Sequence, residues 1–408
     1  MGAASSVGVT GTNGKTSTAS FIAEVLRCAG RRVVCETTVG SNTQPNEFVP
    51  PGAGPFGQRM QRFVDAGVEH FVLETTSEAL AHGWAKRWRF DVGVFTNLSH
   101  DHLNAHGSAE HYLASKAQLF VHLSPGGTAV LNANDVASTF IERVTPSTVR
   151  RLYFSAPSRG ETLVPPTLAL ARCALDRDGT HIELLPGELA DGLGRELHIR
   201  LVGEVFAENA LAAALAGFSF GLEPRVLKAG LFSLERVPGR FEVVVREPCV
   251  VVDYAHSEDA LLRTCVAGRA LLAQLGGSKL IVVFGAGGDR DAEKRTPMGR
   301  AVGAHADVAI VTNDNPRSED PQYIAQALLL GARSGGRAEC FVELERPRAI
   351  ARALETAGKN DVVLICGKGH ELYAVTDGDS APRDDVDCVR RLCGLGVSAQ
   401  DSSHVAST

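Results

Sequence analysis

The residues best suited to chemistry lie in segment 8–17, GVTGTNGKTS, where a short apolar run gives way to a helical pattern. Glycines in such a loop let backbone N–H groups converge on phosphate oxygens, and the following helix N-terminus adds positive potential. Lys15 could reach the β- and γ-phosphates of a nucleotide, and the hydroxyl of Thr16 could bind Mg²⁺. The common P-loop spacing would put a glycine at position 9, where Val9 stands, so we interpret the segment as a variant phosphate-binding loop. The alternative is a glycine-rich turn with an exposed lysine.

A second polar cluster, residues 96–103 with the letters TNLSHDHL, follows another expected strand. Open α/β sheets bind ligands at the carboxyl ends of their strands. Together with Glu74, at the end of the preceding strand, this cluster could supply metal ligands. The alternative is a polar loop with surface histidines. Lys116, in the helical segment 109–120, would by itself pass for a solvated lysine.

Charged and amide groups also follow four expected strands of the second half. The segments are 252–256 (VDYAH), 284–291 (FGAGGDRD), 312–317 (TNDNPR) and 366–371 (CGKGHE). Asp253 could accept hydrogen bonds from a ribose or act as a helix N-terminal carboxylate, and the glycine-rich segment could bind an anion or only turn. Paired carboxylates with an arginine would suit a zwitterionic amino acid, because arginine grips a carboxylate and the acids hold an ammonium group.

The elements that position these residues follow the rhythm of a parallel α/β fold. In the first half, short apolar runs alternate with helical segments. We expect strands at 7–9, 32–36, 70–74, 92–96 and 128–132, and helices at 17–29, 57–66, 109–122 and 209–217. Between about 155 and 201 the sequence becomes richer in Pro and Gly, and its alternating stretches 180–185 and 197–201 predict antiparallel strands on the flank of the sheet.

The second half predicts another doubly wound sheet. We expect strands at 249–253, 280–284, 308–312 and 361–365, and helices at 259–275, 321–332 and 347–357. The predicted fold class is therefore α/β, with a P-loop nucleotide-binding domain built on a mostly parallel sheet and a C-terminal Rossmann-like α/β domain. We place the domains at 1–236 and 237–396, with an unstructured tail at 397–408.

Composition narrows the function classes. The chain has 408 residues, which suggests two domains, and a formal net charge of −6, which argues against a nucleic-acid partner. Nine scattered cysteines without a C-x-x-C pair predict reduced thiols rather than a zinc site. Neither a signal peptide nor a membrane span is expected, so we predict a cytoplasmic protein. The sequence leaves the oligomeric state open, with a monomer as the simplest expectation.

Seven motifs, taken in order and with their spacing, resemble those of the Mur ligase family. They are GTNGKT (11–16), TNLSHDH (96–102), VPGRFE (237–242), DYAH (253–256), GGDRD (287–291), DNPR (314–317) and GKGHE (367–371). The resemblance runs from Val7 to about Tyr373 and is strongest to the branch that joins meso-diaminopimelate to UDP-MurNAc-L-Ala-D-Glu. It implies an ATP-dependent amide-bond ligase of peptidoglycan biosynthesis, which activates a carboxylate as an acyl phosphate and releases ADP.

The resemblance also implies the roles of individual residues, with ATP and two Mg²⁺ ions as cofactors. Catalytic roles fall to Lys15, Glu74, His102 and Lys116, where Lys116 is carbamylated by CO₂ and Thr16, Glu74, His102 and Lys116 are metal ligands. Nucleotide binding falls to Gly11, Thr12, Asn13, Gly14, Lys15, Thr16, Ser17, Asn209, Arg240 and Asp253. Substrate binding falls to Thr43, Arg290, Asp314, Asn315, Arg317, Gly367 and Glu371.

Two departures from the family pattern bear on the carboxylate substrate. The phosphate loop begins within the first ten residues, so we expect the N-terminal domain that grips the UDP sugar to be absent. Glu78 stands where the family has a histidine. A specialised ligase acting on a different carboxylate is therefore one alternative. A P-loop hydrolase or kinase and a non-catalytic nucleotide-binding relic are the others.

Overall fold

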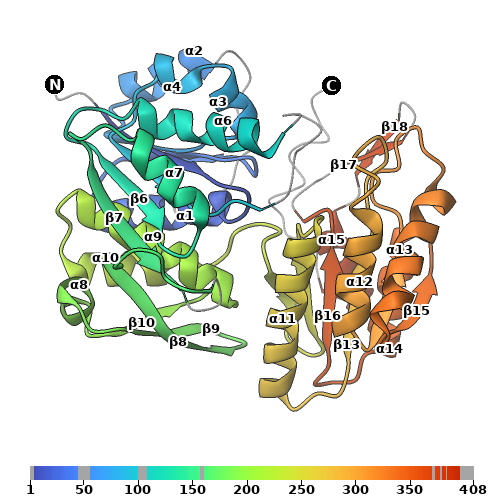
Figure 1. The fold of residues 1–408 in the computed structure, drawn as a ribbon. Coiled ribbons are helices and arrows are strands. Elements are labelled where there is room, and N and C mark those ends of the chain that lie inside the picture. Colours follow the sequence, from blue (N-terminus) through green and yellow to red (C-terminus); the bar gives the residue numbers. More distant parts are fainter. Residues whose placement is uncertain are drawn as a thin grey trace. The chain divides into compact units, whose positions relative to one another are not determined.

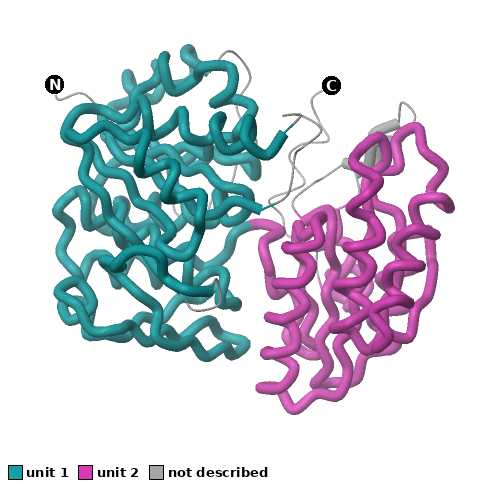
Figure 2. The backbone as a smooth tube through the Cα atoms, viewed as in Figure 1, with its two compact units in different colours: residues 1–237 teal, residues 238–408 magenta. Residues whose placement is uncertain are grey.

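The computed structural model describes residues 4–44, 56–99, 108–156, 160–369, 373–376, 379–382 and 384–395. The chain divides into two compact units, residues 1–237 and residues 238–408 (Figure 2). Each unit has its own sheet, with helices packed on it (Figure 1). The predicted tail, 397–408, lies outside the described residues, as do His102 and Glu371.

The described part of unit 1 is built on a ten-stranded sheet with the order β10-β9-β8-β7-β6-β5-β1-β4-β2-β3. Its strands are β1 (Ser5–Thr10), β2 (Val33–Glu36), β3 (Ser41–Asn42), β4 (His70–Glu74), β5 (Val92–Phe95), β6 (Thr128–Asn132), β7 (Arg150–Ser155), β8 (Leu168–Asp176), β9 (Gly179–Leu184) and β10 (Glu196–Ile199). Strand β1 lies between β4 and β5 and is parallel to both. The chain leads from β1 to β2 on one side, whereas the later connection from β4 leads to β5 on the other side. The loop after β1 therefore lies where the strand order reverses, which is where an open α/β sheet binds its ligand.

The helices of unit 1 pack on this sheet. They are α1 (Lys15–Cys28), α2 (Phe56–Asp65), α3 (Ser77–Ala81), α4 (Trp84–Arg87), α6 (Ala109–Val121), α7 (Val136–Val144), α8 (Glu188–Gly192), α9 (Glu204–Ser219) and α10 (Pro224–Ser233). Helix α9 is buried along most of its length, which its Ala/Leu-rich sequence permits, and it packs against α1 and β6 to β8. Helix α6, which carries Lys116, begins where the Ser108 side chain accepts a hydrogen bond from the His111 N–H.

The described part of unit 2 has a six-stranded sheet with the order β11-β12-β16-β13-β14-β15. Its strands are β11 (Glu242–Val245), β12 (Cys249–Asp253), β13 (Leu280–Phe284), β14 (Val308–Val311), β15 (Glu339–Val342) and β16 (Val362–Cys366), and β17 (Tyr373–Thr376) pairs separately with β18 (Asp379–Pro382). Strands β12 to β16 are parallel, and only β11 is antiparallel to its neighbour β12. All the carboxyl ends of the parallel strands therefore meet at one edge.

The helices of unit 2 are α11 (Glu258–Leu275), α12 (Arg295–His305), α13 (Pro321–Gly335), α14 (Arg346–Thr356) and α15 (Asp385–Leu392). Helices α12 and α13 lie side by side (Figure 1). Glycines permit this close approach, because a Cβ added to Gly303 would lie 1.9 Å from the Ala332 carbonyl oxygen. A hydrophobic core of this unit is formed by Val, Ile and Ala side chains from the strands, from α14 and, through Val389, from α15.

The predicted fold class is confirmed, with two mostly parallel α/β sheets. Strands β8 to β10 extend the sheet of unit 1, because β8 pairs in parallel with β7 before its antiparallel pairing with β9. All nine cysteines lie in the described ranges, and each is a free thiol. Within those ranges no helix is both long enough and apolar enough to cross a bilayer.

Candidate functional site

The phosphate-binding loop connects β1 to α1 through two glycines with left-handed backbone angles. Gly14 has φ 85°, and Gly11 has φ 151°. A Cβ added to Gly11 would lie 1.9 Å from Oγ1 of Thr96, so no larger residue fits there. The backbone of the loop is therefore closely packed against Thr96. It leads to the start of α1, where the free N–H groups of the helix favour binding of an anion.

Two residues of the next strand end hold this loop in place. The Asn97 side chain accepts a 3.0 Å hydrogen bond from the Asn13 N–H and donates one of 3.0 Å to the Asn13 carbonyl oxygen. Thr96 Oγ1 donates a second bond, of 2.6 Å, to the same oxygen. The sequence singled out segment 96–103 for metal binding, and it missed this scaffold role of Thr96 and Asn97.

Lys15, Thr16 and Glu74 meet at the start of α1. Thr16 Oγ1 donates a 2.9 Å hydrogen bond to Oε2 of Glu74, and Lys15 Nζ lies 3.9 Å from Oε1 of the same carboxylate. Lys15 Nζ also donates to the Thr12 carbonyl oxygen at 2.8 Å. A hydroxyl and a carboxylate side by side are hard oxygen donors of the kind that Mg²⁺ prefers, so these residues fit a magnesium–nucleotide complex.

A turn after β2 reaches the same carboxylate. The N–H and hydroxyl of Thr38 donate to Glu74 Oε2 at 3.0 and 3.1 Å. Thr38 belongs to the Thr-rich segment in which Thr43 was predicted to bind substrate. Thr43 itself is exposed, and its role stays a prediction.

Lys116 is buried beside the phosphate-binding loop. Its residue is 1% exposed, its Nζ donates a 2.7 Å hydrogen bond to the Gly11 carbonyl oxygen, and the same nitrogen lies 4.2 Å from the centre of the Tyr112 ring. The Tyr112 hydroxyl is 3.2 Å from Oγ1 of Thr12. The reading of Lys116 as an ordinary solvated lysine is therefore wrong.

The remaining predicted residues of unit 1 lie around the same loop or outside the described ranges. Asn209, on α9, is 4% exposed, and a Cβ on Gly14 would lie 2.5 Å from its Oδ1, so its side chain lies against the loop. Ser17 is buried in the first turn of α1. Glu78, in the short helix α3, is exposed. No three His, Cys, Asp or Glu side chains of the described residues converge in a geometry that could hold a metal ion.

In unit 2, Asp253 ends β12 and organises the backbone around it. Its carboxylate accepts hydrogen bonds from the N–H groups of Phe241 (2.7 Å) and Ala255 (2.9 Å) and from Thr264 Oγ1 (3.0 Å). The guanidinium carbon of Arg240 lies 4.3 Å from the centre of the Tyr254 ring. Asp253 thereby fixes the segment that carries Arg240, a role that the sequence reading did not anticipate.

The predicted amino-acid-binding residues that the structure describes in this unit lie after the carboxyl ends of β13, β14 and β16. Arg317 Nη1 donates to the Gly288 carbonyl oxygen at 2.5 Å, and the Gly288 N–H donates to the Asn315 carbonyl oxygen at 2.9 Å. A Cβ on Gly367, which has φ 119°, would lie 2.9 Å from Asp314 Oδ2. Segments 285–291, 312–319 and 367–369 are therefore close together in this unit. Arg290 is exposed beside them.

Two buried cations, Arg295 next to these segments and Lys368 within one of them, were not predicted to have a role. Arg295, 1% exposed, forms an ion pair of 2.7 Å with Glu319, and Glu319 also accepts a 2.6 Å bond from the Asp289 N–H. The hydrogen bond from Arg295, and then that from Asp289, lower the pKa of Glu319. Lys368, also 1% exposed, lies 3.5 Å from Oδ1 of Asn315. Nothing in the sequence around Arg295 distinguishes it from a surface residue, whereas Lys368 lies within the GKGHE motif, from which no role was predicted for it.

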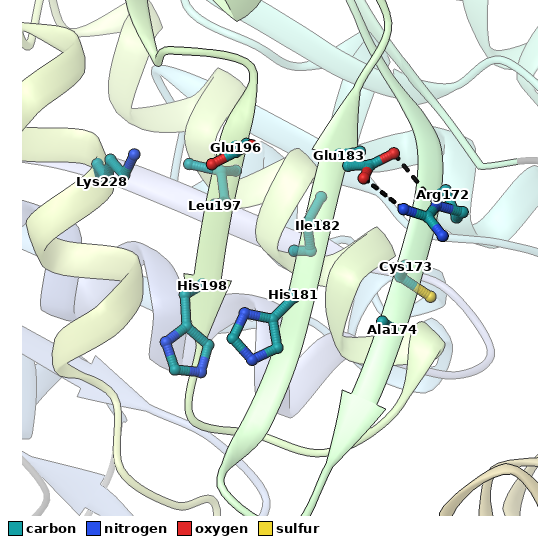
Figure 3. Close-up of a pocket in the computed structure, with 10 residues that line it drawn as sticks. All are labelled: Arg172, Cys173, Ala174, His181, Ile182, Glu183, Glu196, Leu197, His198 and Lys228. Carbon is teal, nitrogen blue, oxygen red and sulfur yellow. Dashed lines mark hydrogen bonds and ion pairs between the residues drawn. The ribbon is translucent and has the colours of Figure 1, made fainter. Parts of the chain in front are cut away.

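A separate pocket of about 290 Å³ opens on β8, β9, β10 and α10 (Figure 3). Four of its side chains contact one another in pairs. Arg172 and Glu183 form an exposed ion pair of 2.6 Å, and the rings of His181 and His198 stack 4.2 Å apart. Burial, followed by the nearby His181, lowers the pKa of His198. None of the predicted site residues lines this pocket.

Comparison with known proteins yields matches in both units. A family model described as the Mur ligase middle domain matches residues 9–217, and one described as Mur ligase, glutamate ligase domain matches residues 239–369. A UDP-N-acetylmuramoyl-L-alanyl-D-glutamate–2,6-diaminopimelate ligase of Solibacter usitatus is 37% identical over 398 residues, covering 93% of this chain and 75% of that protein. The enzyme of the same name from Aquifex aeolicus is 33% identical, covering 95% and 77%.

Solved structures with a similar fold include another ligase of this name and a folylpolyglutamate synthase. A structure of a UDP-N-acetylmuramoyl-L-alanyl-D-glutamate–2,6-diaminopimelate ligase matches with a TM-score of 0.65 and 29% identity over 96% of this chain and 79% of that one. A Mycobacterium tuberculosis folylpolyglutamate synthase complexed with ADP has a TM-score of 0.68 at 21% identity, covering 90% and 88%. The second likeness is one of fold alone.

Proposed function

The chain belongs to the Mur ligase family, whose members are ATP-dependent acid–amino-acid ligases, and from this premise we propose that it joins meso-diaminopimelate to UDP-MurNAc-L-Ala-D-Glu in peptidoglycan biosynthesis. In the proposed reaction the carboxylate takes the terminal phosphoryl group of ATP, and the amine then displaces phosphate to form the amide. ADP, inorganic phosphate and the peptide are the products. The observation that carries the ligase chemistry is the meeting of Lys15, Thr16 and Glu74 at the start of α1.

The residues of unit 1 would bind and orient the nucleotide. The backbone of segment 11–14 and the N-terminus of α1 would hold phosphate oxygens, and Lys15 would neutralise charge on the transferred group. Thr16 and Glu74 would hold Mg²⁺, which would supply positive charge to offset the charge that develops on the phosphate oxygens. His102 is a further proposed ligand. Asn209, whose side chain lies against Gly14, is proposed to contact the nucleotide.

Lys116 is proposed to be carbamylated and to help hold a second Mg²⁺. Its Nζ is buried and lies 2.7 Å from a loop carbonyl oxygen, so a group added to this nitrogen would lie next to the phosphate-binding loop. CO₂ would add to the neutral amine, which loses a proton as the carbamate forms. The carbamate would place an anionic oxygen ligand beside the phosphate-binding loop.

The strand ends of unit 2 are proposed to bind the amino acid. Arg317 and Arg290 would bind carboxylates, whereas Asp314, Glu371 and the amide of Asn315 would bind ammonium groups. Gly367 permits the close approach of these segments. A diaminopimelate molecule has two carboxylates and two amines, so it suits a site with both signs of charge. Arg240 and Asp253 are proposed to help bind the nucleotide during turnover.

A second candidate, a ligase acting on a different carboxylate, is favoured by one observation. Glu78 is exposed in the short helix that directly follows Glu74, where the family has a histidine. An added negative charge near an anionic substrate costs binding energy. We therefore keep a carboxylate other than the UDP-muramyl dipeptide as an alternative substrate.

Amine-dependent ADP release tests the proposal. Protein with ATP, Mg²⁺ and bicarbonate is assayed with UDP-MurNAc-L-Ala-D-Glu and either meso-diaminopimelate or lysine, and then with simpler glutamyl carboxylates. Release that requires both the dipeptide and diaminopimelate supports the proposed substrates. Release with a simpler carboxylate favours the specialised ligase. ADP release that needs no amine would indicate a hydrolase or kinase, and no release with any pair would contradict the proposal.

A further inference from the structure

Arg346 is a buried arginine at the first position of α14, and it pairs with an aspartate from a different helix. Its Nε donates to Oδ1 of Asp385 at 2.8 Å, and its Nη2 donates to Oδ2 at 2.7 Å. Each side chain is 3% exposed. This two-pronged geometry is the strongest form of an arginine–carboxylate contact and fixes the plane of the guanidinium group.

The other donations of Arg346 go to backbone carbonyls at two strand ends. Nη2 donates to the Cys366 carbonyl oxygen at 3.0 Å, and Nη1 donates to the Asn313 carbonyl oxygen at 3.3 Å. Cys366 ends β16, and Asn313 follows β14. These strands are not neighbours, because β13 lies between them. A single guanidinium group therefore ties together two segments that the sheet itself does not hydrogen-bond to each other.

The residues that follow these two carbonyls are Asp314 and Gly367. Both belong to the proposed amino-acid-binding set, and they are already in close approach, since a Cβ on Gly367 would lie 2.9 Å from Asp314 Oδ2. A misplacement of about 1 Å in a binding or catalytic group can reduce activity roughly 100-fold. The position of the guanidinium group thus determines the relative placement of both segments.

The charges are consistent with a fixed cation. Burial opposes the charge of Arg346, but the charge of Asp385 and its hydrogen bonds outweigh burial and raise the pKa of Arg346 above its ordinary value. The carboxylate of Asp314 acts in the same direction. Removal of one partner alone would leave a buried charge, which is strongly destabilising, whereas two apolar residues of similar volume are often tolerated.

We propose that Arg346 and Asp385 form a positioning pair that sets the backbone of both amino-acid-binding segments, and that helix α15 is thereby a functional part of this site. The inference rests on the proposed function, because it assumes that these segments bind the amine. The match to the family model ends at residue 369, so Asp385, in α15, lies in a region that the match does not include. Arg346 touches no substrate in this account and acts only through Asn313 and Cys366.

The test replaces both partners with apolar residues, Arg346→Met with Asp385→Leu, and measures ADP release against the concentration of meso-diaminopimelate and of ATP. We expect the KM for diaminopimelate to rise at least about 10-fold while the KM for ATP changes less than about 3-fold. Arg346→Lys is the second variant, because it keeps the charge and loses the two-pronged contact, and we expect the same selective rise. The control is Arg269→Met, which removes a 2.7 Å ion pair with Asp307 at the opposite edge of the same sheet and should leave both KM values unchanged.

The outcomes separate this inference from the proposed function. No amine-dependent ADP release by the wild-type protein overturns the proposed function and the inference with it. Amine dependence in the wild type, with an unchanged KM for diaminopimelate in a folded variant, overturns the inference alone. An equal rise of the KM for diaminopimelate in Arg269→Met and in Arg346→Lys would also overturn the inference, because it would indicate a general loss of stability. Thermal unfolding of each variant establishes that it is folded.

Discussion

The hydroxyl of Thr16 donates a 2.9 Å hydrogen bond to Oε2 of Glu74, which joins the start of α1 to the end of β4. The same oxygen accepts two bonds from Thr38. One carboxylate therefore connects the phosphate-binding loop to the turn after β2. A change of charge at Glu74 should therefore affect both the phosphate-binding loop and the turn after β2.

Replacing Glu74 by Gln should weaken the use of magnesium without unfolding the protein. A glutamine oxygen can still accept the bond from Thr16, but the negative charge that attracts a divalent cation is lost. We expect the Mg²⁺ concentration for half-maximal ADP release to rise at least about 10-fold. Asp65→Asn, an exposed carboxylate at the end of α2, is the matched control and should change nothing. An unchanged Mg²⁺ requirement in Glu74→Gln would exclude this carboxylate as a metal ligand.

Lys116 should carry a carbamate when bicarbonate is supplied. Incubation of the protein with ¹³C-bicarbonate should give a carbamate resonance that Lys116→Arg lacks, and the same variant should lose roughly 100-fold or more in ADP release. Lys86→Arg, an exposed lysine of α4, should keep both the signal and the activity. A fully active wild-type protein without the resonance would show that this modification is not needed.

The pH dependence of stability should change in Asp384→Asn. Asp384 caps α15 by accepting a 2.8 Å hydrogen bond from the Val386 N–H. Burial, then the nearby Asp387 and Asp385, raise its pKa from 3.8 to about 6. A carboxyl whose pKa is higher in the folded state contributes stability below its unfolded pKa, and this contribution is lost as the pH rises through about 6.

Asparagine can make the same cap without the charge, so Asp384→Asn should be more stable than the wild type at pH 7.5, by about 1 to 2 kcal/mol. The difference should narrow as the pH falls to 5, where the folded wild type is largely protonated at this site. Urea unfolding at the two pH values measures it. A difference that stays constant or grows toward low pH would contradict the raised pKa.

The central strands of both sheets could be predicted from sequence because they are buried on both faces and form continuous apolar runs. Leu280–Phe284, with the letters LIVVF, is the clearest case, and its predicted bounds match those of β13. The antiparallel strands predicted at 180–185 and 197–201 are confirmed by β9 and β10, but strand β8, which joins them to the first sheet, was not predicted. Only Phe154 and Ser155 pair with the start of β8, and so short a register leaves no pattern in the sequence.

The site could be predicted in part because some of its residues are close together in the sequence. Motifs such as GTNGKT combine a strand end, glycines and a lysine in one short segment, so their chemistry can be read locally. Contacts between distant residues cannot be read in this way. Asn97 holds Asn13 across 84 residues, and Arg346 reaches Asp385 across 39. Lys116 donates its hydrogen bond to Gly11, which lies 105 residues earlier.

Transfer of ¹⁸O from the carboxylate substrate to phosphate tests the central claim most directly. UDP-MurNAc-L-Ala-D-Glu labelled in both carboxylates of its glutamate is turned over with ATP, Mg²⁺ and meso-diaminopimelate, and the released phosphate is analysed by mass spectrometry. Because an acyl phosphate loses a carboxylate oxygen when the amine displaces phosphate, each phosphate should carry one ¹⁸O. Unlabelled phosphate released at the same rate as ADP would contradict amide ligation through an acyl phosphate and would indicate hydrolysis of ATP.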